Sequence, residues 1–199
     1  MKLFYSNASP YSRKVKLVII EKGLKESIEE QLCNPFDELP ELKAANPLAK
    51  VPTLVINEGF ALYDSPVICK YINSLVPEKQ LIPTHGMDRW RILRCEALAD
   101  GIMDAAYNIV MERRRSPNLQ SLSASQSWQK NIIDAVKQAE VDIDDLPSSL
   151  SLAQLSLGAA LGYLEFRLPE LDWKSSRVKL ATWYEALSKR SSMIETRPK

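Results

Sequence analysis

The run Val51-Pro52-Thr53-Leu54-Val55-Ile56 is followed by Asn57-Glu58-Gly59 and then by Phe60-Ala61-Leu62. The first and last runs are rich in β-branched and apolar residues, and the middle run has the composition of a short turn. Two strand-forming runs joined in this way predict a β-hairpin. The hairpin supplies antiparallel strands, and the residues on either side of it decide what kind of sheet they join.

Upstream of the hairpin, the sequence predicts a strand, a helix and a second strand. Residues 2–5 read as a short strand, and residues 28–32 alternate between polar and apolar side chains. Between them, Pro10 suits the first turn of a helix and Gly23 suits its end. Two parallel strands joined across a helix require a right-handed crossover. The connection 34–46 contains proline and has room for a short helix.

Downstream of the hairpin, Asp64 or Ser65 is positioned to cap a helix that has Pro66 in its first turn and runs to about Leu75. The order is therefore strand–helix–strand followed by strand–strand–helix. This order is typical of a thioredoxin-like mixed sheet, so we expect an α/β domain at residues 1–76.

The remainder of the chain lacks strand signals. Residues 77–86 contain two prolines and a glycine without periodicity, which is typical of a linker. Beyond it, helical patterns predict an all-α domain over 87–199, with helices at 87–114, 124–141, 151–163 and 177–189. The third of these opens with a capping box formed by Ser151 and Gln154.

Composition narrows the class of protein. The 199 residues include 26 Lys and Arg against 25 Asp and Glu, for a net charge of +1. A near-neutral chain has no global field to hold nucleic acid or an anionic membrane. No run approaches the ~18 apolar residues that a membrane span needs, and the N-terminus lacks the pattern of a signal peptide. We expect a soluble, cytoplasmic protein.

Few residues are available for metal or cofactor chemistry. The single histidine is His85, and no Cys-x-x-Cys pair is present, so we expect no metal site. Glycine-rich nucleotide motifs and the serine-hydrolase elbow are also absent. The three cysteines, Cys33, Cys69 and Cys95, are widely spaced and odd in number, which argues against a disulfide framework. We interpret them as small apolar residues, with Cys33 nearest the expected site.

Three short segments carry candidate chemistry. Ser9-Pro10-Tyr11-Ser12 lies between a strand and a helix start, where unpaired N–H groups favour an anion. Thioredoxin-like oxidoreductases carry a cysteine there. Serine at positions 9 and 12 excludes dithiol chemistry, but a hydroxyl can donate a hydrogen bond to the thiolate of another molecule. The simpler interpretation of Ser9 is an ordinary helix N-cap.

The other two segments are Val51-Pro52 and Asp64-Ser65. A cis bond before Pro52 would leave the backbone of Val51 free to pair with an extended peptide, although only about one X–Pro bond in twenty is cis. The N–H groups and hydroxyl at Ser65 suit a small carboxylate, and Asp64 suits an ammonium. Asp-Ser-Pro is also a common way to start a helix.

Taken in order, these segments resemble the glutathione S-transferase family over essentially the whole chain. The similar segments are Ser9–Val15, Asn46–Pro52, Asp64–Ile68 and Glu96–Ala105, the last resembling bacterial YibF-like members. The resemblance implies the glutathione S-transferase fold, in which a thioredoxin-like N-terminal domain precedes an all-α C-terminal domain. It also implies a homodimer that forms through the helix after Asp64-Ser65 and the long helix that follows the linker.

The resemblance assigns roles to particular residues. Ser9 would face the glutathione sulfur, with Ser12 as the alternative, and Val51 would bind the cysteinyl backbone beside a cis Pro52. Asp64 and Ser65 would take the γ-glutamyl amine and carboxylate. Lys50 would lie near the glycyl end, with Asn34 as a weaker candidate. The acceptor pocket between the domains would contain Tyr11, Met103, Tyr107 and Arg114.

The implied function is transfer of glutathione to an electrophilic small molecule, as in detoxification. Lowering a thiol pKa by ~2 units requires about 2.7 kcal/mol. A hydroxyl hydrogen bond to a charged group supplies about 1.5–3 kcal/mol, and a helix terminus up to about 2 kcal/mol. Two alternatives remain: a non-catalytic binding or regulatory protein, and a glutathione-dependent reductase or peroxidase. Where the family carries an aspartate in the buried helix, Gln154 predicts a slightly weaker cap.

Overall fold

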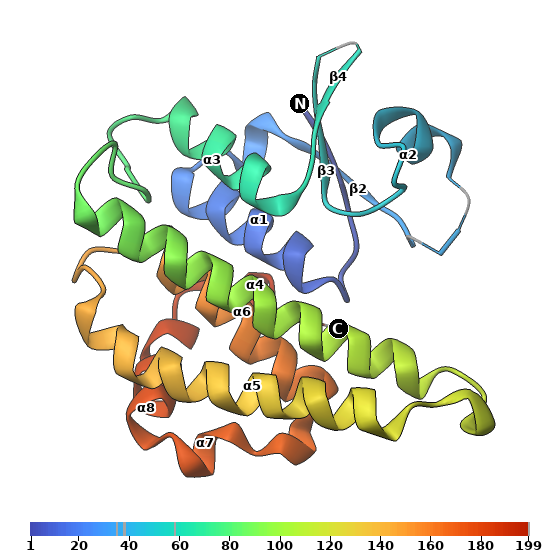
Figure 1. Cartoon of the computed structure of the whole chain (residues 1–199). Helices are drawn as coiled ribbons and strands as arrows, with labels where there is room; N and C mark the ends of the chain where they lie inside the picture. The colour runs from blue at the N-terminus through green and yellow to red at the C-terminus, as the bar shows by residue number, and fades with distance from the viewer. Residues whose placement is uncertain (35, 38, 58, 199) are drawn as a thin grey trace. The chain divides into compact units, whose positions relative to one another are not determined.

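The computed structural model describes residues 1–34, 36–37, 39–57 and 59–198 (Figure 1). Glu58 of the predicted hairpin turn, and residues 35 and 38 of the predicted connection, lie outside the described residues. The chain forms two units. The first contains residues 1–83 and the C-terminal segment that begins at Ser191, and the second is Thr84–Arg190. The C-terminal segment therefore groups with the first unit, whereas the sequence assigned it to the helical domain.

The first unit contains the predicted strand and helix order. Its elements are β1 (Lys2–Tyr5), α1 (Pro10–Lys22), β2 (Glu29–Leu32), α2 (Pro40–Ala45), β3 (Thr53–Asn57), β4 (Phe60–Leu62), α3 (Ser65–Leu75) and α9 (Ser191–Glu195), with a 3-10 turn at Lys25–Ser27. The third strand begins at Thr53 rather than at Val51, since a proline at position 52 has no N–H for a strand ladder.

The four strands form one mixed sheet in the order β2-β1-β3-β4. β1 pairs with β2 in parallel, and the pairs β1–β3 and β3–β4 are antiparallel. This confirms the predicted thioredoxin-like sheet. Because Tyr5 pairs with Leu32, Phe4 with Thr53 and Leu54 with Leu62, the ends of β1, β2 and β4 lie at the same edge as the start of β3.

Helices α1 and α3 lie side by side in the first unit (Figure 1). Ser9 caps the start of α1, and Gly23 ends it with φ of 74°, a left-handed conformation that glycine adopts without a Cβ clash. The core of the unit is formed by fully buried side chains of the sheet and these helices, including Leu3, Val15, Val18, Leu54, Ile68 and Ile72. The apolar core therefore fixes where both helices begin.

The C-terminal segment packs on α1. Arg13 is only 5% exposed, and its Nη2 donates to the Met193 carbonyl at 3.3 Å. Ser192 Oγ donates to Glu21 Oε1 at 2.5 Å. The sequence did not predict α9, because five residues are too few to show helical periodicity. These contacts between the C-terminal segment and α1 stabilise the position of α1, the helix whose N-cap is Ser9.

The second unit is helical. Its elements are α4 (Met87–Arg113), α5 (Leu122–Asp142), α6 (Leu152–Arg167), α7 (Trp173–Ser176) and α8 (Val178–Ser188), with 3-10 turns at Pro117–Leu119, Ile143–Asp145 and Pro169–Leu171. The third predicted helix is one turn longer than expected, and α7 was not predicted. Within the described ranges, no helix is both long enough and apolar enough to cross a membrane.

The start of α6 shows what Gln154 does. The Ser151 N–H donates to Gln154 Oε1 at 2.7 Å, which is the glutamine half of the predicted capping box. Gln154 Nε2 also donates to the Pro147 carbonyl at 3.2 Å. An ionised aspartate could accept the first bond but has no N–H for the second. The glutamine therefore caps the helix and holds the preceding loop.

Candidate functional site

Four segments of the first unit meet at one edge of the sheet. They are the residues after β1, after β2, before β3 and after β4, and the sheet register places them together. They carry all the predicted glutathione-binding residues: Ser9, Asn34, Lys50, Val51, Pro52, Asp64 and Ser65. The fold thus brings these residues to one edge, although they span more than fifty positions of sequence.

Ser9 and Ser12 have different environments. Ser9 is half-buried, and its Oγ accepts a hydrogen bond from the Ser12 N–H at 3.2 Å. A hydroxyl accepts with its lone pairs and still has one proton to donate, and among the described residues that proton has no recorded acceptor. Ser12 is fully buried, and its Oγ accepts from the Ser6 N–H at 3.3 Å. The geometry thus favours Ser9 over Ser12 as the hydroxyl that a ligand could reach.

The backbone N–H and C=O of Val51 are available to form hydrogen bonds with a bound peptide. The Val51–Pro52 peptide bond is cis, as the family resemblance implies. Pro52 is buried and Val51 is half-buried. Within the part of the chain that the structure describes, the N–H and C=O of Val51 have no hydrogen-bond partner. An extended peptide can pair with such a backbone without breaking an existing bond.

A buried polar network fixes the loop before Val51. Asn46 is 1% exposed, and its Nδ2 donates to the Lys50 carbonyl at 3.2 Å and to Thr53 Oγ1 at 3.0 Å. Thr53 Oγ1 donates in turn to the Lys50 carbonyl at 2.8 Å. Asn46 Oδ1 accepts from the Leu48 N–H at 3.0 Å. Because these bonds enclose positions 48–50, they position the backbone of Val51 from the inside.

Asp64 and Ser65 form the N-terminus of α3. Asp64 is exposed and is the N-cap residue, but its side chain makes no capping hydrogen bond. The Tyr63–Asp64 peptide bond is cis. Ser65 is 2% exposed, and Pro66 follows it in the first turn. Unpaired N–H groups at a helix start attract a carboxylate, while the free Asp64 carboxylate attracts an ammonium.

The side chains of Lys50 and Asn34 differ in whether they are already engaged by other groups of the protein. Lys50 is exposed and forms no ion pair with any described carboxylate. Asn34 is exposed, but its Nδ2 donates to Asp37 Oδ1 at 3.0 Å and its Oδ1 accepts from the Phe36 N–H at 3.2 Å. Its side chain therefore stabilises its own turn, and Lys50 is the better-placed polar group.

A cavity of about 550 Å³ lies beside Asn34, between the loop after β1 and the loop after β2. It is lined by Ser6, Asn7, Ala8, Gln31, Leu32, Cys33, Asn34, Asp37 and Leu39. Burial raises the pKa of the Cys33 thiol, whose Sγ donates a hydrogen bond to the Tyr5 carbonyl at 3.5 Å. The thiol therefore stays protonated at neutral pH, and a thiolate nucleophile is disfavoured there.

The predicted acceptor residues are divided between the units. Tyr11 lies in the first unit, and Met103, Tyr107 and Arg114 lie in the second. Met103 is fully buried, Tyr107 is 38% exposed and Arg114, which follows α4, is exposed. That the four line one pocket stays a prediction.

Sequence reasoning did not single out two further residues of the helical unit, Tyr163 and Arg167. Burial raises the pKa of Tyr163, while the positive charge of Arg167 opposes that shift. Sequence reasoning treated this helix as uniformly apolar and ended it at Tyr163, so Arg167 was not considered. The four-residue spacing of a tyrosine and an arginine on one helix face was the available signal.

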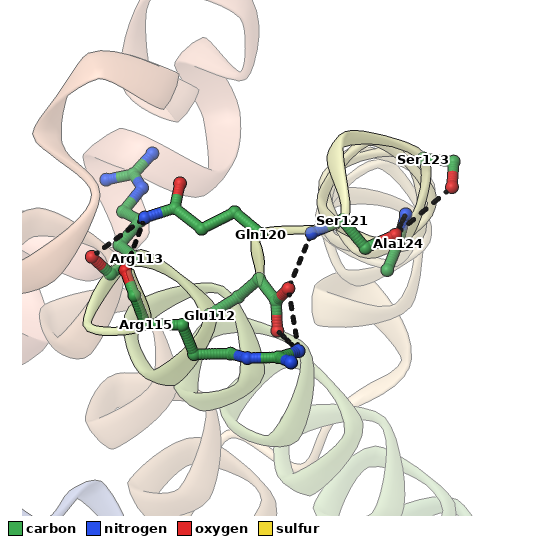
Figure 2. A network of polar contacts seen from close by, with 7 residues as sticks. All are labelled: Glu112, Arg113, Arg115, Gln120, Ser121, Ser123 and Ala124. Atoms are coloured by element: carbon green, nitrogen blue, oxygen red, sulfur yellow. Dashed lines mark hydrogen bonds and ion pairs between the residues drawn. The ribbon is translucent and has the colours of Figure 1, made fainter. Parts of the chain in front are cut away.

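A latch of polar contacts holds the connection between α4 and α5, as Figure 2 shows. Glu112 Oε1 accepts from the Ser121 N–H at 2.6 Å and from Arg115 Nη1 at 3.2 Å. These two bonds lower the pKa of Glu112, while burial acts in the opposite direction. Gln120 Nε2 donates to the Arg113 and Arg115 carbonyls at 3.3 Å and 2.9 Å. The latch therefore fixes the backbone on both sides of Arg114.

The chain is similar to known proteins in sequence and in structure. Residues 3–80 match the family model described as the N-terminal domain of glutathione S-transferase. The chain is 33% identical to YibF of Escherichia coli (strain K12), an uncharacterised glutathione S-transferase-like protein, over 100% of this chain and 98% of that protein.

Two solved structures show the same fold at higher identity. A glutathione transferase family member from Pseudomonas fluorescens Pf-5, with bound S-(propanoic acid)-glutathione, is 37% identical with a TM-score of 0.92 and full coverage of both chains. A glutathione S-transferase from Methylobacillus flagellatus KT, with glutathione bound, is 38% identical with a TM-score of 0.93, covering 100% of this chain and 99% of that one. The chain belongs to the glutathione S-transferase family.

Proposed function

We propose that this protein binds glutathione at the edge formed by Ser9, Val51 and Ser65 and transfers it to an electrophilic small molecule. The observation that carries the proposal is the Ser9 hydroxyl. It stands at the N-terminus of α1 with its acceptor side used by the Ser12 N–H and its proton free of any recorded acceptor within the described ranges. A thiolate is stabilised by accepting a hydrogen bond, and the hydroxyl proton of Ser9 can supply that bond.

The tripeptide is oriented by the other segments of this edge. The cysteinyl backbone pairs with the N–H and C=O of Val51, and the γ-glutamyl carboxylate binds at Ser65. Asp64 takes the γ-glutamyl ammonium, and exposed Lys50 takes the glycyl carboxylate. Each end of the ligand thus meets a group of opposite charge, which fixes the position of the sulfur beside Ser9.

The proposed reaction starts from the ionised thiol. The thiol proton leaves to solvent, and the thiolate is stabilised by the Ser9 hydroxyl and the positive end of α1. The sulfur then forms a bond to the electrophilic carbon of the acceptor. Where that carbon carries a halide, the carbon–halogen bond breaks and the halide departs with its electron pair. The relative that binds S-(propanoic acid)-glutathione supports this proposal, since that ligand carries a substituent on the sulfur.

Reduction or peroxidase chemistry is a weaker candidate. A mixed disulfide between glutathione and the protein would need a thiol at position 9, where a serine stands. Cys33, the cysteine nearest this edge, has a raised pKa through burial. The electrophile-transfer reaction requires no protein thiol and uses the groups that this edge offers.

We also propose that the protein forms homodimers through α3 and α4. Val67 on α3 is 42% exposed, and Met87 and Trp90 on α4 are 65% and 61% exposed. Large apolar side chains at such exposure favour burial against another surface. Light scattering should give twice the chain mass of 22.5 kDa for the native protein. It should give the chain mass for Trp90→Glu, and a native monomer would contradict the proposal.

The transferase proposal is tested by Ser9→Ala with Ser12→Ala as the comparison. Glutathione affinity is measured by calorimetry, the pKa of the bound thiol by thiolate absorbance, and the rate with chlorodinitrobenzene as acceptor. Ser9→Ala should raise the thiol pKa by about one unit or more and lower kcat about tenfold or more, with little change in glutathione Kd. Ser12→Ala should leave the thiol pKa unchanged. Glutathione binding without turnover in the native protein would favour a non-catalytic binding role.

A further inference from the structure

The C-terminal segment covers one face of α1 within the first unit. Arg13, Leu17 and Glu21 follow one another at four-residue spacing, so they lie on the same face of this helix. Leu17 is fully buried, and Glu21 accepts its hydrogen bond from Ser192 Oγ. Both ends of this helix face therefore contact a segment that lies more than 170 positions later in the sequence.

The Arg13 side chain is anchored at several points of this segment. Its Nη2 donates to the Met193 carbonyl oxygen and lies 4.0 Å from Met193 Sδ, and its Nε donates to Thr196 Oγ1 at 3.4 Å. Thr196 Oγ1 donates in turn to the Ser192 carbonyl at 2.8 Å, so the fold of the segment itself fixes this acceptor. A buried guanidinium that donates from two of its nitrogen atoms has little freedom of orientation.

The backbone of Arg13 belongs to the turn that presents Ser9. The Arg13 N–H donates to the Ser9 carbonyl at 3.0 Å, which is the first i→i−4 hydrogen bond of α1. One residue earlier, the Ser12 N–H donates to Ser9 Oγ at 3.2 Å. Both oxygens of Ser9 are therefore held by adjacent N–H groups of one helical turn, and Arg13 contributes one of these groups.

The location of Arg13 is unfavourable for the helix alone. The N-terminus of a helix favours negative charge, yet the described first turn of α1 contains no acidic side chain, and this buried arginine follows directly. A residue that breaks a local rule in this way is expected where it serves a site. Helix ends fray readily, whereas groups that act on a reacting atom must be held within about 0.5 Å of their productive positions.

We infer that Arg13 is a positioning residue for the glutathione site: held by Met193 and Thr196, it fixes the first turn of α1 and with it the hydroxyl of Ser9. This inference rests on the proposed transferase function and adds the C-terminal segment to the parts of the chain that the reaction needs. Arg13 acts through Ser9 in this assignment and does not contact the ligand.

The test is a double-mutant cycle between Arg13 and Ser9 in the full-length protein. Arg13→Met, which removes the donors and keeps an apolar side chain, is made in the native background and in Ser9→Ala. The pKa of the bound glutathione thiol is measured by thiolate absorbance, and kcat is measured with chlorodinitrobenzene. Lys25→Met is the matched control, since Lys25 is exposed and pairs with Glu195 of the same segment.

Arg13→Met should raise the thiol pKa by about 0.5 unit or more and lower kcat about threefold or more, because fewer bound glutathione molecules are ionised. In the Ser9→Ala background the same substitution should shift the thiol pKa no further. Arg13→Lys should restore part of the native behaviour, since an ammonium can still donate to the Met193 carbonyl. Lys25→Met should keep the native thiol pKa and kcat.

The inference is overturned if Arg13→Met keeps the native thiol pKa. It is also overturned if the shift persists in the Ser9→Ala background, because the guanidinium charge would then act on the thiol directly. If Arg13→Met does not fold, Thr196→Val replaces it in the cycle, since valine removes one acceptor and leaves the arginine in place. A native thiol pKa in Ser9→Ala alone would instead overturn the proposed role of Ser9, and this inference with it.

Discussion

The Lys22 ammonium donates a hydrogen bond to the Asn73 carbonyl oxygen at 2.8 Å, although fifty-one positions separate the two residues. The same ammonium donates to the Val76 and Lys79 carbonyls at 2.5 Å and 2.6 Å. Lys22 is 2% exposed and ends α1, while Asn73 lies in the last turn of α3. The helix that begins beside Ser9 is thereby joined to the helix that begins at Ser65.

Replacing Lys22 should therefore destabilise the whole first unit. Lys22→Met keeps the aliphatic length but leaves three carbonyl groups without their donor. We expect the free energy of unfolding to fall by about 2–4 kcal/mol, as measured by chemical denaturation. Lys43→Met, at an exposed position of α2, is the control and should change it by about 0.5 kcal/mol or less. Equal stability of the two variants would show that the hydrogen bonds of Lys22 do not stabilise the first unit.

The Asn46 network gives a second prediction, about the position of Val51. Asn46→Ala removes the donor to the Lys50 carbonyl and to Thr53, and the acceptor of the Leu48 N–H. We expect a loss of about 2–3 kcal/mol in unfolding free energy. Glutathione Kd should also rise about fivefold or more, because Val51 is no longer held. Asn57→Ala, at an exposed position of β3, should change neither quantity. Unchanged affinity in Asn46→Ala would mean that Val51 is positioned without the network.

Much of the first unit could be predicted because its signals are local. Gly23 ends α1 where the sequence indicated, and β3 coincides with the β-branched run that ends at Ile56. The cis state of the Val51–Pro52 bond could not be read from the dipeptide, since most X–Pro bonds are trans. It depends on the surrounding loop, and only the family resemblance implied it.

Contacts between residues that are far apart in the sequence could not be predicted from local sequence patterns. Lys22 resembles any lysine near a helix end, and nothing near it indicates Asn73 as its partner. Arg167 was missed for a similar reason, because the ion pairing that distinguishes it from Arg113 depends on tertiary packing. Periodicity reports which face of a helix is buried and does not report which polar groups are matched there.

The latch at Glu112 predicts a dependence of stability on pH (Figure 2). Hydrogen bonds from the Ser121 N–H and Arg115 lower its pKa below the usual value of 4.5. For a carboxyl group with a lowered folded-state pKa, the stabilisation is present above the unfolded value and is lost as pH falls through the folded value. Native protein should thus be more stable than Glu112→Gln above about pH 5, and this difference should shrink toward about pH 3.

The measurement is thermal or chemical unfolding of both proteins across that pH range. Glu185→Gln, at an exposed position of α8, serves as the control and should follow the native profile. A stability difference between native protein and Glu112→Gln that stays constant with pH would show that the charge of Glu112 does not stabilise the latch.

Asp64 provides the sharpest test of how glutathione is oriented. Asp64→Asn removes the negative charge, and asparagine is an equally good N-cap residue. The Asp64 side chain makes no capping bond, so the fold should be unaffected. Loss of the charge opposite the γ-glutamyl ammonium should raise glutathione Kd about fivefold to tenfold. The matched ligand is glutaryl-cysteinyl-glycine, which lacks only the amino group. It should bind the native protein as weakly as glutathione binds Asp64→Asn, and the variant should not distinguish the two ligands. If the variant still prefers glutathione by the native ratio, the ammonium lies elsewhere, and the orientation along Val51 must be reversed.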